Sequence, residues 1–167
     1  DGRGRLYVNL ESSSEMAEID AAAMKVTRKW PLAPCQSPSG LAIDAEQHLL
    51  FSVCRNRVMV VSDAAAGRVV AQVSIGQGPD AARFDSGTKL AFASTGDGAI
   101  TVVHEDSPTK FRVLQTVKTE AGARTMELDT KTHRLFTVTA RFEPRSGSQR
   151  RRPPVVPGSF ALLVLEQ

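Results

Sequence analysis

The sequence predicts an all-β chain that folds as a β-propeller of four-stranded antiparallel blades. Short apolar and β-branched runs alternate with turn residues along nearly the whole chain, which favours strands over helices. The runs come in groups of four, and the groups return at an interval of about 40 to 45 residues, the length of a propeller blade. A single blade cannot cover its own apolar faces, so neighbouring blades must stack.

The segment from Pro38 to Pro79 is the clearest unit. We expect its four strands at 39–43, 49–53, 58–61 and 69–75, because each run ends at a turn containing Gly, Asp, Asn or Pro. The same pattern lies before and after it. Asp20, Asp63 and Asp106 stand 43 residues apart. A β-sandwich would also space its strands evenly, but it would not repeat them in fours.

Four blades follow from this alignment, at about 1–37, 38–78, 79–122 and 123–167. The first begins at its second strand and the last ends at its third, which makes fourteen strands. We therefore expect the chain to be half of a seven-bladed ring, and the C-terminal half of a longer propeller. The remaining half would come from the same chain or from a second copy, because two bare blade faces should associate with something.

Composition excludes little. The chain has 167 residues and a net charge of +3, and much of that charge lies in the run Arg150–Arg152. A mild excess of this kind favours solubility and does not identify a partner. No stretch is long enough to predict a membrane-spanning helix, and no signal-peptide pattern occurs.

Trp30, near the end of the outer strand of blade one, is expected to pack between blades. If the strands at 39–43 and 49–53 pair around the turn at 45–47, Cys54 faces Pro38 and lies close to Cys35. A disulfide between the two cysteines and a pair of buried free thiols remain equal alternatives. Neither CxxC nor CxxCH nor HxH accompanies them, so no metal site and no cofactor is predicted.

The segment Ser94-Thr95-Gly96-Asp97-Gly98 predicts a tight hairpin turn, because glycine supplies the positive φ. His104 and His133 stand singly near a strand end and in a turn, where histidines are usually surface residues. The last blade carries an irregular loop at 141–158, rich in proline and arginine. The arginines of this loop could bind nucleic acid, but no aromatic side chain is interleaved with them, so a solvated insertion is favoured.

The repeat resembles the YVTN family of β-propellers, and its YncE-like members in particular. The residues that carry the likeness are Pro38-Ser39-Gly40-Leu41-Ala42-Ile43-Asp44 and Gly67-Arg68-Val69-Val70, and blade three keeps Gly78-Pro79-Asp80-Ala81. Blade four departs from the pattern, with Ala123 where the others have proline. The resemblance implies a bacterial protein that is periplasmic or secreted. It does not imply one activity, because propellers are scaffolds for unrelated functions.

In a propeller the connection between blades and the loop between the second and third strands rise on the same face, around the channel. Ser39, Asp80 and Arg124 then occupy equivalent positions at the channel mouth. Five further residues are expected in neighbouring loops: Asn9, Arg55, Asn56, Asp97 and Arg141. Polar groups that converge on a concavity predict a ligand site.

The sequence therefore predicts a non-catalytic scaffold that binds a small molecule or a protein at the channel mouth. The first alternative is a propeller enzyme, either lactonase-like or a quinoprotein dehydrogenase subunit. The second is nucleic-acid binding through Arg150–Arg152.

Overall fold

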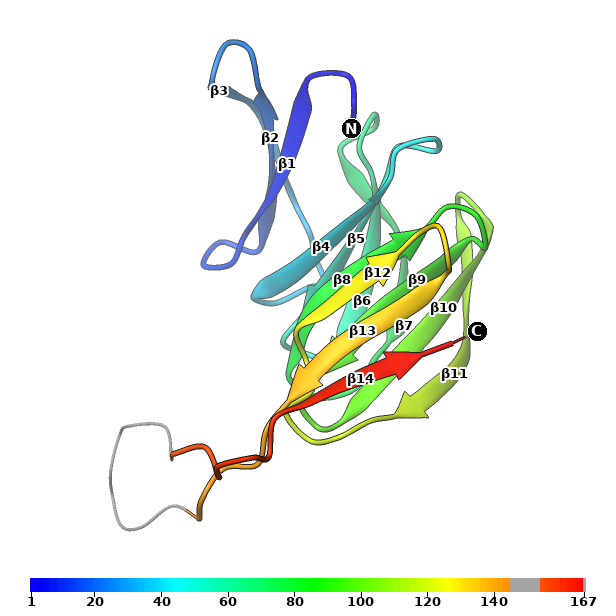
Figure 1. The fold of residues 1–167 in the computed structure, drawn as a ribbon. Helices are drawn as coiled ribbons and strands as arrows, with labels where there is room; N and C mark the ends of the chain where they lie inside the picture. Colours follow the sequence, from blue (N-terminus) through cyan, green and yellow to red (C-terminus); the bar gives the residue numbers. More distant parts are fainter. Residues whose placement is uncertain (145–153, 167) are drawn as a thin grey trace.

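The computed structural model describes residues 1–144 and 154–166, and within them fourteen strands form four antiparallel sheets. The sheets follow one another along the chain, and each is built from consecutive strands (Figure 1). Each sheet is one blade, so the blade order is the order of the sequence. Arg150–Arg152 lie outside the described residues.

The strand bounds follow the predicted pattern closely. Blade one has three strands: β1 (Arg5–Leu10), β2 (Glu15–Asp20) and β3 (Lys25–Pro31). Blade two has four: β4 (Pro38–Asp44), β5 (Leu49–Cys54), β6 (Val58–Asp63) and β7 (Arg68–Ser74). Blade three also has four: β8 (Pro79–Asp85), β9 (Leu90–Thr95), β10 (Ala99–Ser107) and β11 (Lys110–Lys118). Blade four has three: β12 (Met126–Asp129), β13 (Arg134–Thr139) and β14 (Ala161–Leu165).

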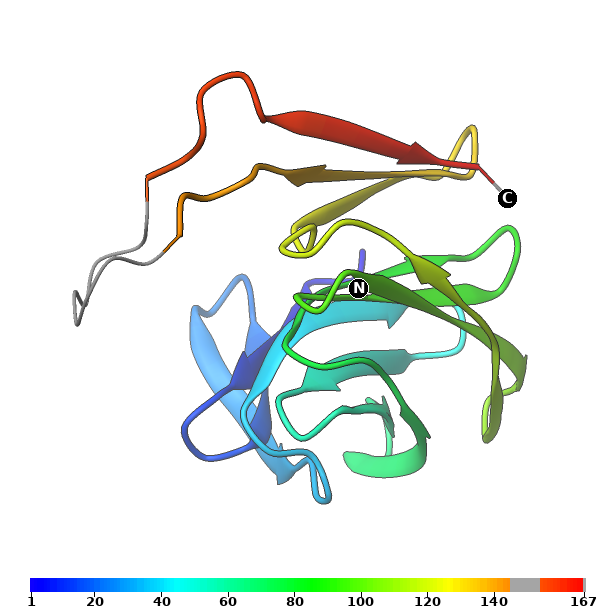
Figure 2. The ribbon, with the colours of Figure 1, turned by 90° about the horizontal axis from the view of Figure 1, so that it is seen from below.

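The first strands of blades two, three and four lie side by side near the middle of the molecule, where β4 contacts β8 and β8 contacts β12 (Figure 1). Gly40 permits the first of these contacts, since a Cβ atom there would lie 2.5 Å from the carbonyl oxygen of Asp80. Figure 2 shows the blades from below, with β14 at the outer edge of the molecule. Because β4, β8 and β12 lie side by side, their first residues lie at the same end of the molecule.

Apolar side chains fill the spaces between neighbouring blades. Between blades two and three, Phe51 stacks on Phe84 with ring centroids 4.9 Å apart. Between blades one and two, Trp30 is almost fully buried, which confirms that it packs between blades. The core is therefore a series of blade interfaces, as stacked repeats require.

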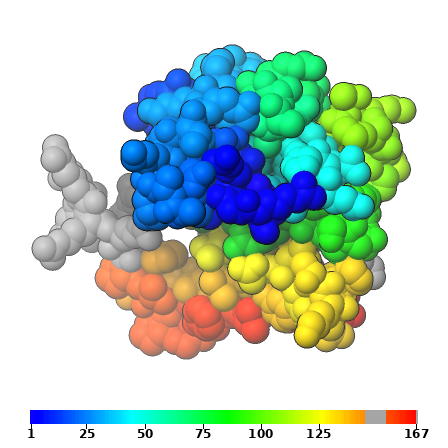
Figure 3. All heavy atoms as spheres, turned by 90° about the horizontal axis from the view of Figure 1, so that it is seen from above, coloured from blue at the N-terminus to red at the C-terminus, as the bar shows by residue number. Residues whose placement is uncertain are grey.

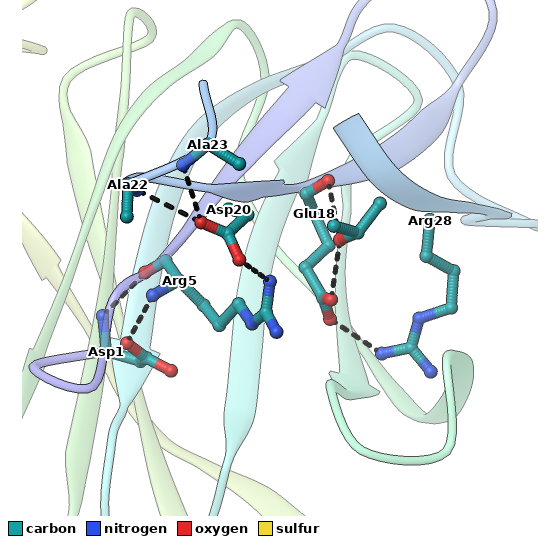
Figure 4. Close-up of polar contacts among 8 residues, drawn as sticks. Asp1, Arg5, Glu18, Asp20, Ala22, Ala23 and Arg28 are labelled. Atoms are coloured by element: carbon teal, nitrogen blue, oxygen red, sulfur yellow. Dashed lines mark hydrogen bonds and ion pairs between the residues drawn. The ribbon is translucent and has the colours of Figure 1, made fainter. Parts of the chain in front are cut away.

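Arg28 joins blade one to blade two at the outer rim. It is held by Glu18 at 2.8 Å (Figure 4), and its guanidinium donates to the carbonyl oxygens of Ala64 and Ala65 in the next blade. The same guanidinium lies over the ring of Trp30 at 4.8 Å. Blade one is thus anchored by both apolar packing and hydrogen bonds.

The predicted pairing of β4 with β5 is confirmed, since Pro38 of β4 lies opposite Cys54 of β5. Of the two alternatives for the thiols, the structure has the disulfide between Cys35 and Cys54. In the part of the chain that the structure describes, no helix is long and apolar enough to cross a membrane.

Candidate functional site

Ser39, Asp80 and Arg124 stand at equivalent places near the starts of β4, β8 and β12, each five residues before the aspartate that ends its first strand. The Oγ atom of Ser39 donates to the carbonyl oxygen of Pro79 in the next blade, at 3.2 Å. The main chain of Arg124 is held in the same way, because its carbonyl oxygen accepts a hydrogen bond from Ser94. Hydrogen bonds from Ser39 and Ser94 to main-chain carbonyl oxygens therefore hold the starts of these strands together. Neither bond uses the side chain of Asp80 or Arg124.

Asn9 lies within strand β1, which corrects its expected place in a loop. Its Nδ2 atom donates to the carbonyl oxygens of Ser39 and Gly40, and its Oδ1 atom accepts from Ser52 at 2.9 Å. These bonds join blade one to blade two and leave little of the amide for a ligand. Its role is structural.

Asn56 and Asp97 are in the expected turns, and both are also occupied by structural bonds. Asn56 bridges the connection between β3 and β4 by accepting from the main-chain N–H of Gln36 and donating to the carbonyl oxygen of Pro34, each at 2.9 Å. Asp97 accepts from Thr95 and from the main-chain N–H of Gln77. These two hydrogen bonds lower the pKa of Asp97.

Arg55 and Arg141 are exposed, and the described contacts use only their main-chain atoms. Arg55 donates its N–H to the connection before β4, whereas Arg141 anchors the base of the loop 141–158 by donating to Ser159 at 3.0 Å. The two side chains are not brought together. They flank the rim without forming one cluster.

Asp80 and Arg124, both predicted at the channel mouth, have side chains that the structure brings close to each other. Their Oδ1 and Nη1 atoms are 4.0 Å apart, and both side chains are about two-fifths exposed, at 38% and 44%. At this separation and exposure the attraction between them is weak, so a competing charged group can displace it. The guanidinium of Arg124 is accessible to a ligand, and it also lines a hollow on the surface.

That hollow has a volume of about 450 Å³ and lies beside blade four. Its lining is mostly apolar, with Arg124 as its charged group: Gly122, Arg124, Thr125, Val138, Thr139, Ala140, Phe142 and Phe160. Phe142 and Phe160 were not expected at a site, because both border the irregular loop at 141–158. A guanidinium beside an apolar wall suits an anionic group carried on an apolar body.

Among residues 1–144 and 154–166, no group of three or more His, Cys, Asp or Glu side chains is placed to hold a metal ion. The described part of the site is therefore one of hydrogen bonds, a guanidinium and apolar surface.

No family model matches the chain, and no curated protein is similar to it. Among solved structures, it is similar to hydrazine synthase of Kuenenia stuttgartiensis, with 17% identity and a TM-score of 0.73. It is also similar to the dihydro-heme d1 dehydrogenase NirN in complex with DHE, with 11% identity and a TM-score of 0.65.

Each match covers 82% of this chain but only 39% and 30% of those proteins, so the chain spans well under half of their length. The chain has a β-propeller fold. At these identities the likeness shows the fold alone, and the fold is shared by proteins of many functions.

Proposed function

We propose that this chain is part of a binding propeller, a non-catalytic scaffold whose channel mouth takes up an anionic group at Arg124. One observation supports the proposal above the others. Asn9, Ser39, Asn56 and Asp97 are used by bonds within the fold, whereas Arg124 is held through its main chain and turns a half-exposed guanidinium to the 450 Å³ hollow.

The chemistry of the residues that line the hollow limits the classes of ligand that it can bind. Its apolar residues offer contact area without hydrogen bonds, and Arg124 offers paired donors for a carboxylate. We therefore expect a small aromatic or aliphatic carboxylate, or an acidic side chain of a partner protein, in preference to a neutral sugar.

We also propose that the protein is of the bacterial YVTN type and works in the periplasm or outside the cell. The repeat pattern of Pro38–Asp44 supports the first statement. The disulfide between Cys35 and Cys54 supports the second, because disulfides persist in oxidising compartments.

Benzoate is a suitable probe, since it combines a carboxylate with an apolar ring. In an NMR titration of the ¹⁵N-labelled protein, we expect the amide signals of Arg124, Thr125 and Ala140 to shift. Arg124→Gln should abolish these shifts. Arg55→Gln is the matched control, because Arg55 is an exposed arginine outside the hollow. Shifts that survive Arg124→Gln, or that are absent in the unmodified protein, would contradict the proposal.

A further inference from the structure

The faces on which one blade receives the next are built from four side chains at repeating positions. Strand register defines them. In blade two, Phe51 faces Val61 and Val53 faces Met59. In blade three, Phe92 faces Val102 and Ser94 faces Ile100, so one of the four positions is polar there. All of these side chains are buried, because the following blade covers them. The quartet is thus the signature of a covered C-terminal blade face.

Blade four carries the same quartet without a cover. By register, Phe136 faces Val164 and Val138 faces Leu162. Leu162 and Val164 are 56% and 49% exposed, whereas their counterparts Met59 and Val61 are fully buried. Leu165, on the opposite side of β14, packs toward blade three. The exposed side is therefore the one on which a fifth blade would sit.

Blade one, at the other end of the series of blades, also has an exposed apolar face. Tyr7 packs toward blade two, so Leu6 and Val8, which alternate with it along β1, point the other way. Leu6 and Val8 are 52% and 42% exposed, and Val26 joins them across the sheet at 53%. In blades two and three the equivalent face receives the preceding blade.

A polar contact accompanies the interface between blades two and three and the interface between blades three and four. The aspartate that ends a first strand binds a side chain from the next blade: Asp44 binds Lys89 at 3.2 Å, and Asp85 binds His133 at 2.6 Å. Both carboxylates are 1% exposed. Asp129 is the equivalent residue of blade four, but it is only half-buried and bonds to Lys131 and Thr132 of its own turn.

The corresponding turn of blade one carries positive charge. It runs from Asp1 to Arg5, and its position equivalent to Lys89 is Gly4, between Arg3 and Arg5. Arg5 is tied to Asp20 at 2.9 Å (Figure 4), whereas the side chain of Arg3 is exposed and, among the described residues, bonds to the ring of His48. Figure 3 shows this turn on the same face as the cyan and yellow turns of the later blades.

We propose that the uncovered face of blade four (Phe136, Val138, Leu162 and Val164) docks on the uncovered face of blade one (Leu6, Val8 and Val26) of a second copy, head to tail. Each copy carries one face of each kind, and Asp129 of one copy then meets the arginine-bearing turn of the other. A head-to-tail contact closes into a ring if its rotation permits and forms an open chain otherwise. Val138 belongs both to this face and to the lining of the hollow beside Arg124, but the test of the assembly uses no ligand.

The test uses two substitutions at exposed positions, Val164→Asp and Val8→Asp, with sedimentation velocity at about 100 μM. We expect the unmodified protein to form dimers or longer assemblies, and each variant to be monomeric. An equal mixture of the two variants should form a one-to-one complex, because each retains the face that the other lacks. Val113→Asp is the control, since Val113 is 43% exposed on β11, outside both faces.

Circular dichroism establishes that each variant is folded, and Leu162→Lys replaces Val164→Asp if the latter unfolds. A monomeric unmodified protein would overturn the proposal. So would dimers that persist in one variant alone, because they would pair like faces, and so would a mixture that stays monomeric. Asp129→Ala should weaken the assembly about tenfold, and an unchanged affinity would remove Asp129 from the interface.

Discussion

The contact between blades two and three differs from that between blades three and four, although both use the same backbone positions. In the first, Lys89 bonds to Asp44 at 3.2 Å and to Glu46 at 3.3 Å. In the second, His133 bonds to Asp85 at 2.6 Å. The residue two places after each aspartate differs accordingly, with Glu46 in one turn and Gly87 in the other.

Gly87 makes room for the imidazole, since a Cβ atom at this position would lie 2.8 Å from Cε1 of His133. Glu46 instead supplies a second carboxylate to the ammonium of Lys89. The second residue after each aspartate therefore matches the side chain that contacts the turn: Glu46 goes with Lys89, and Gly87 goes with His133. Repeats can thus keep the same backbone positions at an interface while the side chains that make the polar contact change.

The electrostatic surroundings differ as well. Burial lowers the pKa of Lys89, but hydrogen bonds to Asp44 and Glu46 outweigh it, so the pKa is raised. Burial and the nearby Asp44 raise the pKa of Glu105, a third carboxyl at this contact. At Asp85, burial raises the pKa, but hydrogen bonds from His133 and from the main-chain N–H of Gly87 are among the contacts that lower it overall.

Lys89→Ala should produce the largest loss of stability. It leaves the buried carboxyls of Asp44 and Glu105 without the ammonium that compensates them. Lys89 is 33% exposed, and the main-chain N–H groups of Glu46 and Gln47 still donate to Asp44. We therefore expect a cost of about 3 kcal/mol, the lower end for a buried ion pair that loses one partner. Urea unfolding of this variant, with exposed Lys131→Ala as control, measures the loss. A change equal to that of the control would show that the carboxyls find another partner.

His133→Ala should cost less, about 2 kcal/mol, because it removes the partner of one buried carboxyl, Asp85, whereas Lys89→Ala affects both Asp44 and Glu105. His48→Ala is the matched control. His48 stands at the equivalent position of blade two, but its ring bonds only to the exposed Arg3 in the described contacts. Urea unfolding should separate the two variants clearly, and equal effects would mean that the contact between His133 and Asp85 contributes nothing.

Asp85 should make stability depend on pH in the acid range. Its pKa lies below the ordinary 3.8 in the folded chain, so its contribution is complete above that value and is lost as the pH falls through the folded pKa. Unfolding free energies measured between pH 2 and 6 should therefore fall less steeply in Asp85→Asn. The contribution of Lys89 has the opposite sign, since its raised pKa places the loss above about pH 10.5.

Gly87→Ala should have the smallest effect, about 1 kcal/mol, from crowding against the imidazole. The loss should shrink in a His133→Ala background, because the ring that the added methyl group would meet is gone. A double-mutant cycle by urea unfolding measures this coupling. Additive losses would show that the turn and the histidine are independent.

Much of the fold was predictable from the sequence. The runs at 39–43 and 49–53, the hairpin around Asp97 and the packing of Trp30 all follow from local pattern and hydrophobic burial. The bonds of His133 were not predictable, because its partner Asp85 is 48 residues away. The available signal was a histidine or lysine four residues after each first-strand aspartate, at His48, Lys89 and His133.

The sequence by itself determined the strands, the four-blade repeat and the register that brings Cys54 opposite Pro38. These depend on periodicity and turn chemistry, which act over a few residues. Only the tertiary structure decided which polar side chains are used by the fold. Asn9 and Asn56 read as ligand groups in the sequence, but they bond to neighbouring segments, while Arg124 stays exposed. That distinction depends on where the next blade lies, and packing between blades sets it.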